Sequence, residues 1–230
     1  MSSTSLCCFP FFSHHGDTKS TQQQQLQQQH PPLIAAYHEP PPTKSNSNNN
    51  RDSTNDDYYR NNPTPFGRIL AGELPSRTYL ESSELLAFRD RSPKAPFHAL
   101  VIPKQYVKNV YSLRGVTRYS DGEQRDNKSQ ESNNDIQLIQ NMRQMGLDLL
   151  QQYQPEALAS EDYILCFHIP PFNSVDHLHL HVLAPASEMN WVYREIKYKC
   201  GARWCTSDLE VIERLMAGLP AVRYQHPFQC

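Results

Sequence analysis

The sequence has neither a long apolar run nor a marked excess of charge of either sign. Its 230 residues carry a formal net charge of −2, and the pI is near 6.5. Without a basic excess, the composition does not indicate nucleic-acid binding. Because no stretch approaches the length that crosses a bilayer, we expect no association with membranes.

The sequence also lacks a convincing targeting segment. The apolar patch at residues 6–12 is short, is interrupted by Pro10 and follows no positive charge, whereas a secretory signal needs a longer run and a basic start. The first arginine is Arg51, which argues against an Arg-rich transit peptide. The six cysteines are therefore expected to be free thiols in a reducing compartment. We expect a cytoplasmic location, with the nucleus as the alternative.

Apolar residues are scarce over residues 1–62, where Gln, Asn, Ser, Pro and His dominate. Such a stretch buries too little apolar surface to offset the entropy of ordering, which predicts a disordered, low-complexity region. Residues 114–134 are polar and too long for an ordinary loop, so they are predicted to be a flexible insertion. One domain is then expected over residues 63–218, followed by a tail at 219–230.

The apolar pattern of that domain predicts the α+β class, an antiparallel sheet with a few helices packed on it. Five segments have the composition or alternation of strands, namely 78–80, 84–88, 98–102, 163–167 and 177–183. Helices are predicted at 66–70, 104–113, 135–154 and 208–217. The strands at 163–167 and 177–183 are close in sequence, so we expect them to lie side by side as an antiparallel pair.

One segment carries an unusual density of histidine. His177, His179 and His181 recur at every second position, and an apolar residue follows each of them. This period predicts a strand with the three imidazoles on one face and aliphatic side chains on the other. Each imidazole brings nitrogens that need partners, so the row does little for stability. The pattern therefore indicates a functional site.

Two kinds of chemistry suit this row of histidines. A neutral imidazole can attack phosphorus and form a covalent intermediate, while its neighbours hold its tautomer and stabilise charge. The loop before the strand could offer backbone N–H groups and the side chains of Asn173 and Ser174 to phosphate oxygens. Zinc coordination by three histidines is the competing use. The residues alone leave both open, although no nearby Asp or Glu pattern completes a metal set.

These residues resemble the histidine-triad signature, in which three histidines alternate with apolar residues and two apolar residues end the motif. The resemblance extends to residues 66–106, which are similar to the N-terminal half of the histidine-triad nucleotide-binding (Hint) proteins, most clearly over residues 86–104. Residues 167–175 are similar to the third human-type Hint branch. The resemblance covers residues 63–215 apart from the insertion, and it implies the histidine-triad fold.

The resemblance implies the activity of an adenosine 5′-monophosphoramidase, which cleaves the P–N bond of AMP-linked amines. His179 would be the nucleophile, His177 would orient it, and His181 would contact the phosphate. His98 matches the family's upstream histidine beside the triad. The resemblance implies a purine nucleotide substrate and a homodimer, and it implies no metal or cofactor for the reaction.

Five further residues match nucleotide-binding positions of the family. Phe88 would line the base pocket and Asp90 would bind the ribose hydroxyls. Asn173 and Ser174 fall in the phosphate loop, and His168 lies just ahead of it. Each position has a simpler interpretation: Phe88 can be a core residue, Asp90 a turn residue and His168 a solvated loop residue.

Two alternatives remain open at this point. An aprataxin-like hydrolase that removes AMP from DNA 5′ ends would share the chemistry of His179 and would need contacts to DNA. Such proteins carry a C-terminal zinc finger, and Cys200, Cys205, His226 and Cys230 are four candidate ligands. The other alternative is a nucleotide-binding scaffold without catalysis. The sequence does not specify the leaving amine or a preference for adenine over guanine.

Overall fold

The structure is a computed structural model that describes residues 62–116 and 127–223, without the side chains of 127–133. The predicted disordered region, except for Asn62, therefore lies outside the described residues, as do 117–126 of the predicted insertion and the end of the predicted tail. Within the described part, no helix is long and apolar enough to cross a membrane.

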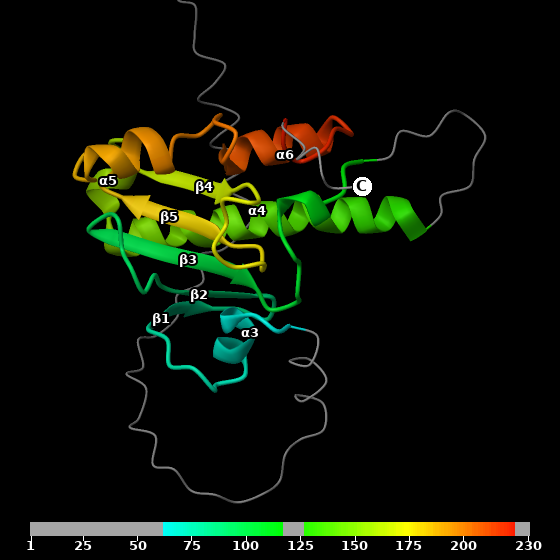
Figure 1. Ribbon diagram of the computed structural model, residues 1–230, viewed down its shortest axis with the longest axis horizontal. Helices are drawn as coiled ribbons and strands as arrows, with labels where there is room; N and C mark the ends of the chain where they lie inside the picture. The colour runs from blue at the N-terminus through cyan, green and yellow to red at the C-terminus, as the bar shows by residue number, and fades with distance from the viewer. Residues whose placement is uncertain (1–61, 117–126, 224–230) are drawn as a thin grey trace, which may run out of the picture. The chain divides into compact units, whose positions relative to one another are not determined.

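In the part of the chain that the structure describes, an antiparallel sheet of six strands forms the centre of the fold, in the order β1-β2-β3-β5-β4-β6 (Figure 1). The strands are β1 Thr78–Glu81, β2 Leu85–Arg89, β3 Phe97–Pro103, β4 Ile164–His168, β5 Leu180–Ala184 and β6 Cys205–Ser207. The α+β prediction is confirmed, and so is the antiparallel pairing of β4 with β5. The three-residue strand β6 was not predicted.

Among the described residues, four helices and two short helical turns accompany the sheet. They are α3 Pro65–Leu70, α4 Asn127–Tyr153, α5 Pro155–Ala159, α6 Asp208–Met216, η1 Val110–Ser112 and η2 Tyr193–Lys197. The start of α6 is capped as its sequence predicts, because the Ser207 hydroxyl accepts a hydrogen bond from the Glu210 N–H. α4 begins at Asn127, inside the predicted insertion, since no glycine or proline interrupts residues 127–134.

The helix predicted over residues 104–113 is wrong, because only the short turn η1 forms there. The backbone of Asn109 is extended, and its side chain accepts a hydrogen bond from the Tyr111 N–H. The carbonyl of Val107 accepts a hydrogen bond from the Leu178 N–H. In an α-helix it would accept one from the N–H four residues later in the chain. This contact ties the segment to the stretch that leads into β5.

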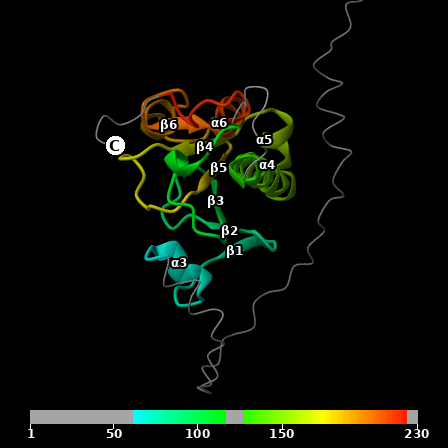
Figure 2. The same ribbon diagram turned by 90° about the vertical axis from the view of Figure 1, so that its right-hand side faces the viewer.

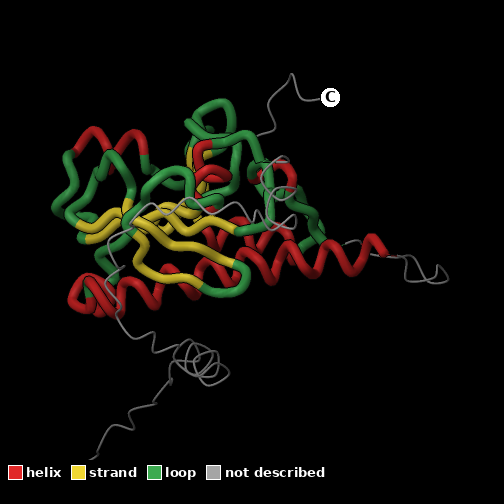
Figure 3. The backbone as a smooth tube through the Cα atoms, turned by 90° about the horizontal axis from the view of Figure 1, so that it is seen from below, coloured by secondary structure: helices red, strands yellow, loops and turns green. Residues whose placement is uncertain are grey.

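One face of the sheet is covered by α4 and α6 and is apolar throughout (Figures 2 and 3). Alternate residues of each central strand point to it, for example Val101 of β3 and Val182 of β5. Met142 and Met145 of α4 are buried in this core, as their spacing predicts. The predicted tail begins too early, because Ala221 and Val222 are buried in the same core.

The opposite face of the sheet carries the polar side chains. His98 of β3, His181 of β5 and His168 of β4 lie on it, with α3 covering the end formed by β2 and β3. Figure 2 shows α3 and α4 on opposite sides of the strands. The candidate site is built on this second face.

Candidate active site

The histidine row lies partly ahead of its strand. β5 begins at Leu180, so that His177 and His179 belong to the stretch before it and only His181 lies within it. Leu178 and Leu180 are buried in the α4-side core, as the alternation predicts. The prediction of one strand over 177–183 with all three imidazoles on one face is therefore only partly correct, because the rings have different surroundings.

His179 is held in one tautomer by the backbone. Its Nδ1–H donates a hydrogen bond to the carbonyl oxygen of His177 at 2.7 Å, which leaves the lone pair on Nε2. The ring is buried and meets Phe66 edge-on at 5.4 Å between centroids. Burial lowers the pKa of His179, so the imidazole is neutral near pH 7. This is the protonation state that a nucleophile requires.

Both ring nitrogens of His177 are hydrogen-bonded, to groups outside the other histidines. Its Nε2–H donates to the carbonyl oxygen of Pro103 at 2.9 Å, and its Nδ1 accepts a hydrogen bond from the Asn62 amide at 2.9 Å. Burial lowers the pKa of His177 to about 4. Asn62 reaches this position because residue 67 is glycine, where a Cβ would lie 2.2 Å from the Asn62 carbonyl oxygen.

A chain of hydrogen bonds fixes the tautomer of His181. The Lys94 N–H donates to His98 Nδ1 at 3.2 Å, and His98 Nε2–H then donates to His181 Nδ1 at 3.0 Å. His181 must therefore carry its proton on Nε2, which is buried and has no hydrogen-bond partner among the described residues. A buried donor without a partner is rare in proteins, so this N–H is available to a bound ligand.

His98 and His168 complete a cluster of neutral imidazoles. Burial lowers the pKa of His98 to about 4 despite the nearby carboxylate of Asp90, which raises it. Burial, and then the proximity of His179, lowers the pKa of His168 to about 4. The His168 ring lies 4.6 Å from that of His181, and its Nε2–H donates to the Lys197 carbonyl at 3.3 Å.

The ring of Tyr198 packs against three imidazoles of this cluster. Its ring is buried and lies 5.0 to 5.8 Å, between ring centroids, from those of His168, His181 and His98. Sequence reasoning missed Tyr198, because it lies in an aromatic and charged segment without a clear period. It also missed Asn62, which was assigned to the disordered region.

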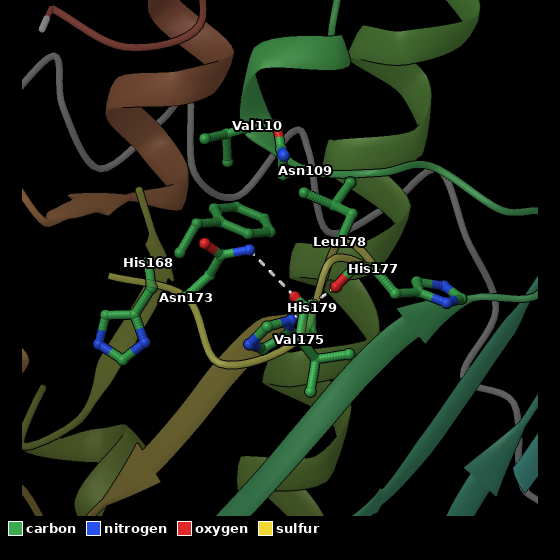
Figure 4. Close-up of a pocket in the computed structure, with 9 residues that line it drawn as sticks. Asn109, Val110, His168, Asn173, Val175, His177, Leu178 and His179 are labelled. Carbon is green, nitrogen blue, oxygen red and sulfur yellow. Dashed lines mark hydrogen bonds between the residues drawn. The ribbon is translucent and has the colours of Figure 1, made fainter. Parts of the chain in front are cut away.

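A pocket of about 180 Å³, counting the space open to solvent, lies where these elements meet. Its walls include His168, Asn173, His177 and His179, and Figure 4 shows the His177 ring turned away from the other two rings.

The predicted phosphate loop is shaped by its own side chains. The Asn173 amide donates to the Val175 carbonyl at 3.1 Å and to the Asp176 carboxylate at 2.8 Å. This places Asn173 on the pocket wall as a residue that organises the loop. Ser174 is exposed and does not line the pocket, so the structure does not bring its side chain to the histidines.

The two predicted nucleoside-binding residues lie on β2 and just after it. The Asp90 carboxylate lies 3.5 Å from His98 Nε2, and it also accepts a hydrogen bond from the Ser92 N–H. Phe88 is 3% exposed and packs edge-on against Phe66 at 5.5 Å between centroids. Phe66, which was not predicted as a site residue, therefore stands between Phe88 and His179.

Among the described residues, two groups that contain imidazoles have ligand atoms close enough together to hold a metal ion. One is His168, His179 and His181, and the other joins Asp90 to His98 and His181. Of the predicted zinc ligands, Cys200 and Cys205 lie together, whereas His226 and Cys230 lie outside the described residues.

Residues 63–197 match the family model described as "Scavenger mRNA decapping enzyme C-term binding". This match spans more than half of the chain. The chain belongs to the histidine-triad superfamily. The resemblance seen in the sequence is thus confirmed.

Relatives with named activities are similar over most of their own length. The adenosine 5′-monophosphoramidase HINT3 of Danio rerio is 36% identical over 138 residues, which covers 60% of this chain and 72% of that protein. The bifunctional adenosine 5′-phosphosulfate phosphorylase/adenylylsulfatase HINT4 of Arabidopsis thaliana is 34% identical over 134 residues, or 58% and 77% of the two chains. A solved HIT family hydrolase from Legionella pneumophila Philadelphia 1 is 30% identical and covers 52% of this chain and 90% of that one, with a TM-score of 0.37.

Proposed function

We propose that the protein is an adenosine 5′-monophosphoramidase that transfers AMP from an amine to His179 and then to water. The observation that carries this proposal is the hydrogen bond from His179 Nδ1–H to the His177 carbonyl. It leaves a neutral imidazole with its Nε2 lone pair free, on the wall of a small pocket that His168 and Asn173 also line. A neutral, fixed imidazole is a competent nucleophile toward phosphorus.

In the first step His179 Nε2 attacks phosphorus, the P–N bond breaks, and the amine leaves after its nitrogen takes a proton from solvent. The product is AMP bonded to Nε2, and the imidazole then carries a positive charge shared with Nδ1–H. The His177 carbonyl oxygen already accepts this hydrogen and stabilises the charge. The role assigned to His177 is thus carried by its backbone, while its ring fixes the backbone in place.

In the second step water attacks phosphorus and loses a proton to solvent, the P–Nε2 bond breaks, AMP leaves, and His179 returns to its neutral form. The unpartnered His181 Nε2–H would donate to a phosphate oxygen in both steps. His98 acts through His181, because it holds that proton on Nε2. Lys94 and Lys197 lie close enough to lower the pKa of His98, and their positive charge would favour an anionic substrate.

The remaining predicted residues would serve the nucleoside and the phosphate loop. Asp90 is the carboxylate nearest the cluster, and in this proposal it accepts hydrogen bonds from the ribose hydroxyls. Phe88 would support the base through Phe66, on which it packs. His168 and Asn173 would shape the phosphate pocket, and Ser174 could contribute only through its backbone. A homodimer is also expected, and light scattering on the purified chain tests it.

The leaving group is the part of the proposal that needs a direct test. The two relatives named above act on different adenylyl compounds, although they are similarly close to this chain. The full chain should be assayed for AMP release from adenosine 5′-monophosphoramidate, adenosine 5′-phosphosulfate and 5′-adenylated DNA. We expect the phosphoramidate to have the largest kcat/KM.

Each other result would count against the proposal in a different way. A larger kcat/KM on the phosphosulfate would replace the amine with sulfate as leaving group. Release from adenylated DNA alone would favour the aprataxin-like alternative. AMP binding without turnover of any of the three compounds would leave the scaffold alternative.

A further inference from the structure

A second cluster of reactive side chains lies beside the histidines and has no part in the proposed hydrolysis. The Sγ atoms of Cys166, Cys200 and Cys205 all lie within 4.8 Å of one another. Cys166 and Cys205 are buried, whereas Cys200 is exposed. The three come from β4, β6 and the turn before β6, so the fold assembles the cluster from separate segments.

The register of β4 and β6 sets the spacing of the two buried thiols. Cys166 lies opposite Ser207, and Cys205 lies opposite His168, so the cysteines are diagonal neighbours on one face of the sheet. Diagonal neighbours of an antiparallel pair lie about 7–8 Å apart between Cα atoms. This exceeds the roughly 7 Å at which a disulfide can form without movement of the backbone. An ion between the sulfurs spans such a diagonal more readily.

The third thiol is brought in by a tight turn. The φ of Gly201 is +82°, a backbone conformation that residues with a side chain rarely adopt. The Ala202–Cys205 bridge then folds the chain back. The Cys-x4-Cys spacing thus places Cys200 against the two strand cysteines.

We propose that Cys166, Cys200 and Cys205 bind one zinc ion through their three sulfurs, with the fourth coordination position open to solvent beside Cys200. Thiolates are the ligands that zinc prefers at such sites. Zn–S bonds of about 2.3 Å in tetrahedral geometry place sulfurs roughly 3.8 Å apart, so only a small contraction of the cluster is needed. The set differs from the four candidate ligands named from the sequence in that it includes Cys166.

Such an ion would be coupled to the active site through the strands. Cys166 lies directly opposite His181 on β5, and Cys205 lies directly opposite His168 on β4. Cys200 follows Tyr198, the residue that covers the histidines, by two positions. The ion would therefore tie together the three segments that hold these side chains, which is a structural role.

The test uses the purified, reduced full chain loaded with zinc and then dialysed. Elemental analysis should find about one zinc per chain, and cobalt in its place should give a thiolate-to-metal charge-transfer band. Cys200→Ser removes the exposed ligand with the least risk to folding, and it should weaken zinc binding at least about 10-fold. The matched control replaces Cys7 and Cys8 together with Ser and should bind zinc as the wild type does.

Thermal unfolding provides a second measurement. Zinc should raise the Tm of the wild type and of the control but not of Cys200→Ser, because an ion that binds the folded state alone stabilises it. Metal content is measured without substrate, so this result does not depend on the proposed hydrolysis.

Three results would overturn the proposal. One is a wild type that retains no zinc, and another is a Cys200→Ser variant that retains as much as the wild type. The third is a disulfide among these three cysteines in the chain as isolated, seen by peptide mass mapping without reductant.

Discussion

The two faces of the sheet are formed by the same strands but bury different kinds of side chain. On the α4 side, the buried residues of β3, β4 and β5 are all apolar, and they pack against a helix. On the other side the same strands bury His98, His168 and His181 together with Cys166, and the neighbouring β6 adds the buried Cys205. The first face needs only burial to be stable, whereas each polar group of the second needs a specific partner.

Because of this contrast, we expect the second face to carry the functional site. Its histidines are held by the backbone of His177, by Asn62 and by the chain from Lys94 to His181. His181 Nε2, a buried nitrogen without a hydrogen-bond partner among the described residues, lies in the same cluster as His179. The predictions below separate the two faces by what each substitution should change.

The largest effect is expected at His179. His179→Ala should lower kcat on an AMP-linked amine by about 10³-fold or more, because no other group can form the adenylyl intermediate. The Tm should fall modestly, because the buried ring also packs against Phe66, so kcat is compared per folded molecule. Steady-state kinetics and thermal unfolding check both statements, and wild-type turnover in this variant would refute the assignment.

The matching change on the α4 side is Leu149→Ala. Leu149 is fully buried in α4, so its truncation should cost about 2–5 kcal/mol of unfolding free energy. Denaturant titration measures this loss, and kcat per folded molecule should stay at the wild-type value. A variant of unchanged stability, or one with a catalytic defect like that of His179→Ala, would erase the distinction between the faces.

A smaller catalytic effect is expected at His181. His181→Leu keeps the volume but removes the unpartnered Nε2–H, and kcat should fall by about 10²-fold. The adenylyl intermediate should still form, only more slowly, which single-turnover kinetics can show. If kcat were unaffected, the phosphate contact assigned to this nitrogen would be wrong.

The smallest effect concerns pH and stability. The folded-state pKa values of His98, His168 and His177 are lowered to about 4, whereas an unfolded histidine titrates near 6.5. The unfolded chain therefore binds more protons between these values, and stability is lost as the pH falls from 6.5 toward 4. The loss should be about 1 kcal/mol for each of the three histidines at pH 6. Denaturant titrations across this range test it, and a flat profile would show that the imidazoles are not buried in the neutral form.

The face of the sheet that packs on α4 was predicted well, because the buried positions show as a regular spacing of apolar residues in the sequence. The alternation of Leu178, Leu180 and Val182, the hairpin of β1 and β2 and the cap of α6 all follow from neighbouring residues. The helix predicted over 104–113 failed where long-range hydrogen bonds replaced local ones.

The second face was predicted from the spacing of the three histidines and from the family resemblance. The structure gathers His98, His168, His179 and His181 into one buried cluster with Tyr198, whereas the His177 ring binds Pro103 and Asn62 instead. Asn62, Tyr198 and the meeting of Cys166 with Cys200 could not be found, because each depends on a contact between distant residues.

The most direct test of the central claim is to trap the intermediate. The full chain should be mixed with an AMP-linked amine, quenched in denaturant during the first turnover, digested and mapped by mass spectrometry. The account predicts an adenylyl group on the peptide that contains His179, attached to that residue. An adenylyl group on another histidine, or none at any time during the first turnover, would contradict it.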